Sequence, residues 1–294
     1  MIASRIYQVL KTGAAISNFR YEPEDSPGAV FSVSVVPFQR QQAGLPTSAL
    51  MIAEDLTQTE QLRGLEVETA NLRLVVRMSE RLTNEIPNAL VPISTYLQLM
   101  DDKWKDPEFR RTLKGAMADH VVRLDRLAHQ TNILARDTLL ETGPFPIGPL
   151  IEEAFQEAAK HANGKGPKLN LEPAAPPLEL DGERKALKQA LVEIFLNAMQ
   201  ANTTDPSVNV RLQNGAVLSG GPGIQIEVQD NGTGFSQEAL LHATEPFFTT
   251  RIVGNGLGLT VSKKAVEMHR GKLEIVQSRP GGPGLVRITL PSPK

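Results

Sequence analysis

The apolar residues of the chain follow three successive patterns, and the first is typical of strands. Over residues 29–38 apolar and polar residues alternate as in a half-buried strand, and a second apolar run covers residues 50–53 after the turn-forming Gly44 and Pro46. Together with a leading helix, these strands predict a partial β-rich unit over residues 1–55.

From residue 56 to about residue 100 the apolar residues recur every three or four positions, as on a helix. The repeat is a heptad in which nine of twelve seam positions are apolar. The seam positions are Leu62, Leu65, Thr69, Leu72, Val76, Ser79, Thr83, Ile86, Leu90, Ile93, Leu97 and Met100. A long helix cannot bury such a stripe alone, so we expect a partner helix from a second copy of the chain.

A polar turn at residues 101–107 separates this helix from a second one, predicted over about residues 108–136. The seam of the second helix reads Leu113, Met117, His120, Leu124, Leu127, Thr131 and Leu134. Two antiparallel helices per chain, doubled in a homodimer, would form a four-helix bundle.

After a linker rich in glycine and proline at residues 143–149, predicted helices and strands are mixed to the end of the chain. Helices are expected at about 147–162, 182–201 and 257–269, and strands near 168–171, 178–180, 208–212, 224–229, 272–277 and 285–290. This order predicts an α/β sandwich over residues 143–294. The predicted fold class is multidomain α+β, with a β-rich unit (1–55), a coiled-coil helix (56–80), a helical hairpin (81–142) and the sandwich.

Composition excludes several classes of function. A formal net charge of -2 gives no electrostatic reason to expect a nucleic-acid partner, and the absence of cysteine excludes disulfides, thiolate zinc sites and a cysteine nucleophile. Nowhere do about eighteen apolar residues run together, so we expect neither a membrane span nor a signal peptide in this chain. A cytoplasmic location is expected.

The first candidate site is a pair of polar residues on a predicted helix. Glu193 and Asn197 are four residues apart, which places a carboxylate and an amide on one face. An amide oxygen is a suitable ligand for Mg²⁺, and a carboxylate can deprotonate a nearby hydroxyl or water. Taken alone, an exposed polar face is the more common explanation of such a pair.

Two glycine-rich segments follow. In D-N-G-T-G at residues 230–234, Asp230 could accept a hydrogen bond from an exocyclic amine, while the glycines allow close approach of a base or phosphate, although ordinary turns share this pattern. In G-N-G-L-G-L at residues 254–259, the free N–H groups at a helix start suit a triphosphate. The acidic residue expected downstream in a dinucleotide-binding fold is missing.

In this order, and with E-P-F-F-T-T-R at residues 245–251 between the glycine segments, the motifs resemble those of the histidine-kinase, gyrase, heat-shock-chaperone and mismatch-repair ATPase superfamily. The resemblance implies a fold that binds ATP and Mg²⁺, with Asn197 on the metal and Asp230 on the adenine amino group. It also implies that base, phosphates and a lid over residues 246–256 involve Gly232, Gly234, Phe247, Thr250, Arg251, Gly254, Gly256, Leu257 and Gly258. For Arg251, an exposed surface cation is an equal alternative.

The position of these motifs behind a helical hairpin favours the kinase branch. The stretch N-E-I-P-N at residues 84–88 resembles the dimerisation and phosphotransfer helix of nitrogen-regulator-type sensor kinases, whose motif begins His-Glu. The resemblance implies Asn84 at the phosphoacceptor position, Glu85 as the base, Glu193 in the catalytic site, and Asn88 as the residue that positions water. The heptad frame independently directs Asn84, Glu85 and Asn88 outward from the seam.

An amide nitrogen is not a usable nucleophile, so we expect no phosphohistidine at Asn84. A substitution that keeps shape while removing chemistry and a natural loss of transfer remain equal explanations. The resemblance implies a homodimeric protein-histidine kinase, inactive in autophosphorylation as written, whose partner is the receiver domain of a response regulator. The alternatives are a degenerate or phosphatase-type module that binds ATP and a regulator, and a chaperone-like or repair-type ATPase in which Glu193 activates water.

Two further expectations concern the ends of the chain. Residues 6–55 resemble the later half of a PAS sensor domain, and no ligand is assigned to it. His269 ends the last predicted helix, where a role in capping the helix C-terminus explains it.

Overall fold

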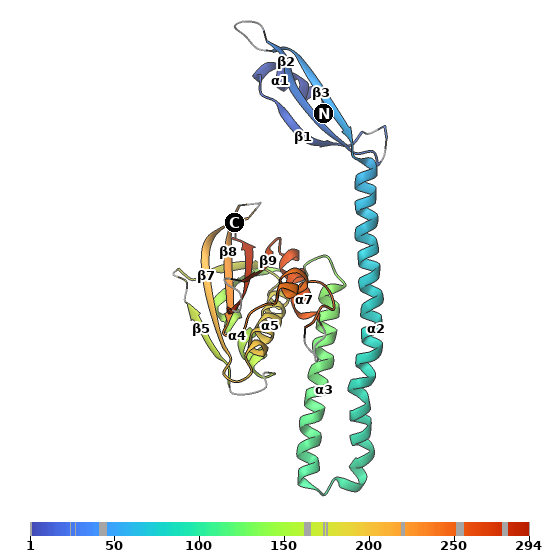
Figure 1. The fold of residues 1–294 in the computed structure, drawn as a ribbon, viewed down its shortest axis with the longest axis vertical. Helices are drawn as coiled ribbons and strands as arrows, with labels where there is room; N and C mark the ends of the chain where they lie inside the picture. Colours follow the sequence, from blue (N-terminus) through green and yellow to red (C-terminus); the bar gives the residue numbers. More distant parts are fainter. Residues whose placement is uncertain are drawn as a thin grey trace. The chain divides into compact units, whose positions relative to one another are not determined.

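The computed structural model describes residues 2–23, 25–26, 28–40, 46–161, 166–172, 174, 176–218, 221–250, 256–277 and 282–293. The chain forms two compact units, Met1–Ser79 and Glu80–Lys294, whose elements are labelled in Figure 1. Among the described residues, no helix combines the length and the apolar character that a membrane crossing needs.

The first unit contains a small antiparallel sheet covered by a helix. Its elements are α1 (Ile2–Thr12), β1 (Ile16–Tyr21), β2 (Phe31–Arg40) and β3 (Pro46–Asp55), in the sheet order β1-β2-β3. The alternation expected over residues 29–38 is present in β2, where Val33 and Val35 are buried against Val9 of α1. Strand β1 was not predicted, because its register shifts between Ile16 and Phe19 and Asn18 has a φ of 52°.

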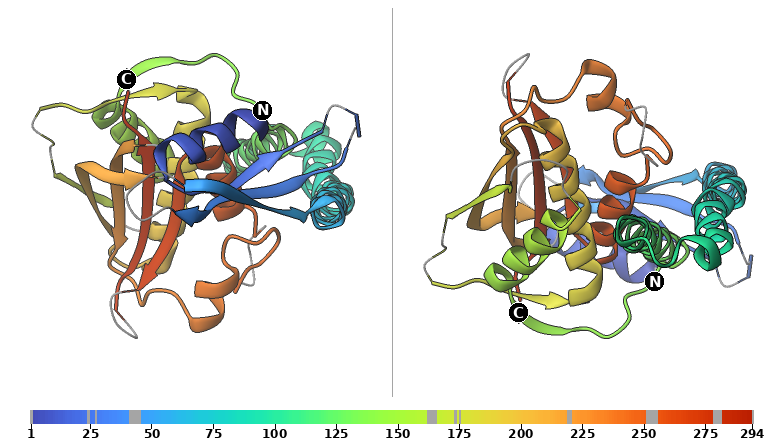
Figure 2. Two further views of the ribbon diagram at one scale, coloured as in Figure 1. Left: turned by 90° about the horizontal axis from the view of Figure 1, so that it is seen from above. Right: turned by 90° about the horizontal axis from the view of Figure 1, so that it is seen from below.

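Two long helices follow, α2 (Thr57–Lys103) and α3 (Pro107–Leu134). The turn between them ends at Asp106, whose side chain accepts a hydrogen bond from the N–H of Glu108 at 2.8 Å, and Pro107 stands at the helix start, where a missing N–H costs nothing. The C-terminal half of α2 lies antiparallel beside α3, as Figures 1 and 2 show. The rings of Tyr96 and Phe109 are 6.1 Å apart across this contact.

The two helices use their apolar positions differently. In the predicted seam of α3, Leu113, Leu127 and Leu134 are buried. In contrast, many predicted seam residues of α2 remain exposed in the single chain, namely Leu62, Leu65, Leu72, Val76, Ile86, Leu90 and Leu97. The α2 seam therefore offers an apolar stripe along the helix.

The prediction that Glu85 points outward is wrong. The residue is only 6% exposed, and its carboxylate pairs with Arg123 of α3 at 2.5 Å. The heptad frame considered only contacts with a second copy of the chain, whereas Glu85 lies on the side of α2 that faces α3. Asn84 and Asn88 are exposed, as the frame predicted.

The C-terminal part is a two-layer sandwich. A five-stranded sheet in the order β5-β7-β8-β10-β9 is covered on one face by helices α4, α5 and α7, as Figure 2 shows. The strands are β5 (Lys168–Glu172), β7 (Ser207–Leu218), β8 (Gly221–Asp230), β9 (Lys272–Gln277) and β10 (Gly284–Pro291), and only β5 and β7 pair in parallel. The helices are α4 (Ile147–Ala159), α5 (Arg184–Ala201) and α7 (Gly258–Met268).

The core of the sandwich lies between the helices and the sheet. It contains Phe155 of α4, Phe195 of α5, Val266 of α7, and Ile226 and Ile288 of the sheet. Every helix and strand predicted over residues 147–290 is present, with ends shifted by a few residues. Strands β4 (Gly143–Pro146) and β6 (Glu179–Gly182) form an antiparallel pair, so part of the expected linker is a strand, and the short helix α6 (Gln237–His242) was not predicted.

Candidate nucleotide-binding site

A cleft of about 930 Å³ opens in the second unit between the sandwich and α3. This volume lies within the range of about 300–1,000 Å³ that small-molecule sites occupy. The predicted site residues that line the cleft are Glu193, Asn197, Asp230, Gly234, Thr250, Gly256, Leu257 and Gly258. The fold therefore brings the polar helix pair and both glycine segments to one place, although they are widely separated along the chain.

Asp230 ends β8 at the edge of this cleft. The residue is 6% exposed, and its Oδ1 atom accepts hydrogen bonds from the N–H groups of Gly232 at 2.7 Å and Gly284 at 3.2 Å. These contacts fix the carboxylate between the end of β8 and the start of β10. The cleft thus carries a well-oriented acceptor of the kind that an exocyclic amine requires.

The glycine segments owe their sequence to backbone geometry. Gly234 has a φ of 75°, and a Cβ atom there would lie 2.2 Å from the carbonyl oxygen of Gly282. Gly256 has a φ of 61°, and its Cβ would lie 2.5 Å from the carbonyl carbon of Phe247. Any side chain at either position would push the neighbouring backbone away. Both segments can therefore keep this backbone conformation only with glycine at these two positions.

The remaining predicted residues of the glycine segments lie around the cleft. Gly232 packs against Ala201 of α5, where an added Cβ would be 2.6 Å from the Ala201 Cβ. Phe247, with a φ of 69°, donates its N–H to the carbonyl oxygen of Gly256 at 2.8 Å, while its neighbour Phe248 lines the cleft. Arg251 and Gly254 lie outside the described residues.

Helix α5 supplies the polar pair. Asn197 is half-buried and lines the cleft, so its amide oxygen suits a hard cation such as Mg²⁺. In the described part of the chain, no three His, Asp or Glu residues are grouped in a way that could hold a metal. Asn197 could hold Mg²⁺ together with phosphate oxygens and water, since this ion is often bound by few protein ligands.

Glu193 is deeply buried, at 1% exposure, and its carboxylate is surrounded by donors. Its Oε1 atom accepts hydrogen bonds from Arg126 Nε at 2.9 Å, Gln130 Nε2 at 2.9 Å and Gln189 Nε2 at 3.1 Å. The Nη2 atom of Arg126 donates to Oε2, which makes the pair bidentate. Burial works against the charge of Arg126, but the contacts with Glu193 outweigh it and raise the pKa of the guanidinium above its usual value.

Several cleft residues were not identified from the sequence. Val122, Arg123, Arg126 and Gln130 come from α3, and Lys160 and His161 follow α4. Arg126 and Glu193 are 67 positions apart. Only the i,i+4 spacing of Arg126 and Gln130 hinted at a shared polar face, and charged helix faces with this spacing are common on protein surfaces.

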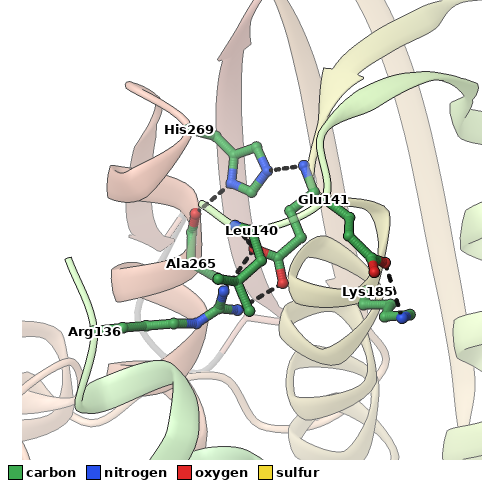
Figure 3. Close-up of polar contacts among 7 residues, drawn as sticks. Arg136, Leu140, Glu141, Lys185, Ala265 and His269 are labelled. Carbon is green, nitrogen blue, oxygen red and sulfur yellow. Dashed lines mark hydrogen bonds and ion pairs between the residues drawn. The ribbon is translucent and has the colours of Figure 1, made fainter. Parts of the chain in front are cut away.

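A second buried polar cluster holds the segment that leaves α3, as Figure 3 shows. The Arg136 guanidinium donates to both carboxylate oxygens of Glu183 at 2.7 Å, and the N–H of Leu140 donates to the same carboxylate at 2.8 Å. Burial would raise the pKa of Glu183, but Arg136 and the Leu140 N–H outweigh it and hold the pKa below its usual value. The segment between α3 and the sandwich is thereby fixed to the start of α5.

His269 belongs to the same cluster. It caps α7, as expected, and it is also buried, with Nε2 accepting the N–H of Glu183 at 2.8 Å and Nδ1 facing the carbonyl oxygen of Ala265 at 2.7 Å. Burial lowers the pKa of His269, opposed in part by the Ala265 carbonyl. The helix-capping role predicted from sequence did not include the contact with Glu183.

The three residues predicted on α2 do not line the cleft. Asn84 and Asn88 are exposed on α2, and Glu85 is paired with Arg123. Because Arg123 itself lines the cleft, α3 contacts both the α2 carboxylate and the nucleotide cleft.

Comparison with known proteins points in one direction. Residues 182–294 match the family described as histidine kinase-, DNA gyrase B-, and HSP90-like ATPase. The chain is 24% identical to sporulation kinase B of Bacillus subtilis over 83% of its own length and 56% of that protein. It is 26% identical to the signal transduction histidine-protein kinase AtoS of Escherichia coli over 83% of its own length and 39% of that protein.

Solved structures show the same fold. A histidine kinase ThkA, crystallised in complex with the response regulator protein TrrA, is similar with a TM-score of 0.55 and 21% identity over 99% of this chain and 83% of that one. The Acinetobacter baumannii histidine kinase AdeS has a TM-score of 0.50 and 18% identity over 71% of this chain and 98% of that one.

The chain spans about half, or less, of the curated relatives described above. The ATP-binding fold that the sequence motifs predict agrees with the family match and with the fold of the similar structures. Residues 182–294 match the histidine kinase-, DNA gyrase B-, and HSP90-like ATPase family, and the proteins to which the chain is similar include a signal transduction histidine-protein kinase.

Proposed function

We propose that this chain is the cytoplasmic core of a sensor histidine kinase in which the ATP-binding domain is intact and phosphotransfer is blocked at Asn84. The observation that carries this proposal is the cleft that gathers Asp230 and Asn197 with three glycines of the two segments, namely Gly234, Gly256 and Gly258. A carboxylate acceptor, an amide ligand and a helix start in one cleft supply the groups that an adenine triphosphate with Mg²⁺ requires.

Different residues of the cleft would bind different parts of the nucleotide. Asp230 would accept the adenine amino group, and Asn197 would hold Mg²⁺, which shields phosphate charge. The N–H groups at the start of α7, from Gly256 to Gly258, would contact phosphate oxygens, because a helix N-terminus attracts anions. Thr250 lines the cleft and would contact the phosphates, while the predicted lid residues Arg251 and Gly254 lie outside the described residues.

The exposed position of Asn84 supports its assignment as the phosphoacceptor position. In a kinase of this type the side chain at this position must be reached by the ATP-binding domain and then by a receiver domain, and Asn84 and Asn88 are both accessible. The lone pair of the Asn84 amide nitrogen is delocalised into the carbonyl group, so this nitrogen is not a usable nucleophile and transfer would stop before the first covalent step. Asn88 would position water for dephosphorylation of a regulator.

A homodimer is also part of the proposal. The exposed apolar stripe on α2 is too long and too regular for a free surface, and a second copy of α2 presents the same stripe. Two hairpins joined along it would form a four-helix bundle. The unit over residues 1–55 would be the later half of a PAS-like sensor domain, whose signal would enter through α2.

The test compares the chain with its Asn84→His variant in γ-labelled ATP. Label that appears only in Asn84→His, and that is released by acid but stable to alkali as a phosphoramidate is, would support a blocked kinase. The matched control is Asn88→His, which places a histidine on the same exposed stretch of α2 and should stay unlabelled. If neither Asn84→His nor the original chain takes up label although both bind ATP, a degenerate signalling module is the correct description instead.

A further inference from the structure

Two arginines about one helical turn apart on α3 form ion pairs with the two carboxylates that the proposed kinase chemistry would use. Arg123 pairs with Glu85, and Arg126 pairs with Glu193. Residues three apart on a helix lie on one face, so both arginines point to the same side of α3. One helical turn therefore contacts the segment beside Asn84 and the carboxylate of the ATP-binding domain.

The contacts of Glu193 leave little capacity for further chemistry. Its Oε1 atom accepts three hydrogen bonds within 3.1 Å, from Arg126, Gln130 and Gln189, and its Oε2 atom accepts one from Arg126. A carboxylate offers about four acceptor sites in all. Oε1 is thereby fully occupied, and Oε2 keeps only one acceptor site beside its contact with Arg126, so Glu193 in this arrangement could take a proton only at that one site.

Three of these four residues lie where phosphates would enter. Arg126, Gln130 and Glu193 line the cleft together with Gly256 and Gly258. A Cβ atom on Gly258 would be 2.8 Å from Glu193 Oε2, so the start of α7 lies directly against this carboxylate. A triphosphate at the helix start would bring several negative charges next to a buried negative charge, which is unfavourable unless a cation moves between them.

Arg126 is suited to move from the carboxylate of Glu193 to a phosphate. A guanidinium presents the same planar fork to a phosphate as to a carboxylate, and its charge persists at any pH that the protein meets. The nucleotide phosphates and Glu193 therefore compete for the N–H donors of the same guanidinium group.

We propose that Arg126 exchanges Glu193 for the phosphate oxygens of bound ATP, so that α3 holds the carboxylate inactive until the nucleotide arrives. This inference rests on the proposed function. In the nucleotide-bound state Arg126 is a binding residue for the triphosphate, and Glu193 is released toward the cleft. Because Arg123 lies one turn earlier, a shift of α3 that follows this exchange also changes its contact with Glu85 beside the phosphoacceptor position.

The test is a double-mutant cycle on nucleotide affinity in the full chain, measured by calorimetry with a non-hydrolysable ATP analogue and with adenosine. Glu193→Gln removes the competitor and should tighten binding of the ATP analogue several-fold. Arg126→Gln should weaken it by about tenfold, a change of about 1.4 kcal/mol, and should leave adenosine affinity unchanged. In the double variant the tightening by Glu193→Gln should be lost, because it requires Arg126.

Arg111→Gln is the matched control, since Arg111 is exposed on α3 and lies outside the cleft, and it should change neither affinity. Arg126→Lys keeps the charge without the fork and should shift affinity in the same direction as Arg126→Gln but less, which covers the case that Arg126→Gln does not fold. Tightening by Glu193→Gln that persists in the double variant would overturn the exchange. Absence of ATP binding in the original chain would instead refute the proposed function.

Discussion

His269 Nε2 and the backbone N–H of Glu183 are joined by a hydrogen bond of 2.8 Å. Because Nδ1 faces the carbonyl of Ala265, the proton resides on Nδ1 and the buried ring is neutral. A proton added to Nε2 would oppose the N–H of Glu183. The Glu183 carboxylate and the Arg136 guanidinium are the charged groups near the ring, and they act on its pKa in opposite directions.

We expect the ATP-binding domain to lose stability in mild acid. The pKa of His269 is lower in the folded protein than in the unfolded chain, so between these values the unfolded chain binds more protons, and the free energy of unfolding falls as pH decreases through about 6.5. Hydrogen exchange of peptides from α5 and α7 should become faster from about pH 7.5 to about pH 5.5, after correction for intrinsic exchange.

The His269→Gln variant should remove most of this pH dependence. His161→Gln, at an exposed position, should retain it. An unchanged pH dependence in His269→Gln would contradict the assignment to the buried ring.

The Arg136 and Glu183 pair should contribute much more to stability than a neighbouring surface pair. Arg136→Gln leaves a buried carboxylate without its bidentate partner, and we expect a loss of about 3–5 kcal/mol in the free energy of unfolding. Lys185→Gln removes an ion pair with Glu141 whose side chains are 84% and 83% exposed, and it should have little effect. Urea denaturation followed by circular dichroism measures both, and equal losses would contradict the structure.

Two glycines with positive φ should respond differently to alanine. Gly215 has a φ of 88° and open space around the added Cβ, so Gly215→Ala should cost only the backbone strain of about 1–2 kcal/mol. Gly234→Ala carries the same strain and also displaces the backbone near Gly282. Calorimetry should show that Gly234→Ala weakens binding of an ATP analogue by at least about tenfold while Gly215→Ala does not. Equal affinities in the two variants would show that Gly234 does not contribute to the nucleotide site.

The exposed stripe on α2 predicts a dimer that one charge can disrupt. Leu90 is a seam residue and Val91 lies beside the seam, and they are 46% and 61% exposed in the single chain. Leu90→Glu should shift the mass measured by light scattering toward the monomer, because the seam would bury a pair of carboxylates, whereas Val91→Glu should not. A monomeric original chain would refute the homodimer.

The fold could be predicted over the sandwich because its signals are local. The alternation of β8, the helical period of α5 and the glycines of residues 230–234 each depend on neighbouring residues, and the structure contains all three elements. The convergence of Asp230, Asn197 and Gly258 on one cleft followed from the order of the motifs, since that order is specific to one ATP-binding fold.

Contacts made by pairs of distant side chains could not be predicted. Nothing near Arg126 in the sequence indicates Glu193, and nothing near His269 indicates Glu183, because an ion pair or a buried hydrogen bond leaves no periodic pattern. Glu85 was assigned to the wrong side because α2 has two faces to satisfy. The heptad describes one of them, and the contact with α3 determines the other.

Helix α3 is attached to the ATP-binding domain at two places. Arg126 joins it to Glu193, and just beyond its end Arg136 and Asp137 join Glu183 and Lys264. From Arg126 to the end of α3 at Leu134 the helix rises by about 12 Å, and Arg136 follows two residues later. A helix attached at one point can rotate about that point. A helix attached at two points cannot rotate unless the ATP-binding domain moves with it or one of the two contacts breaks. Any rotation of α3 must therefore either drag the nucleotide cleft with it or detach the Arg126 end first, which is the end that the nucleotide itself can loosen.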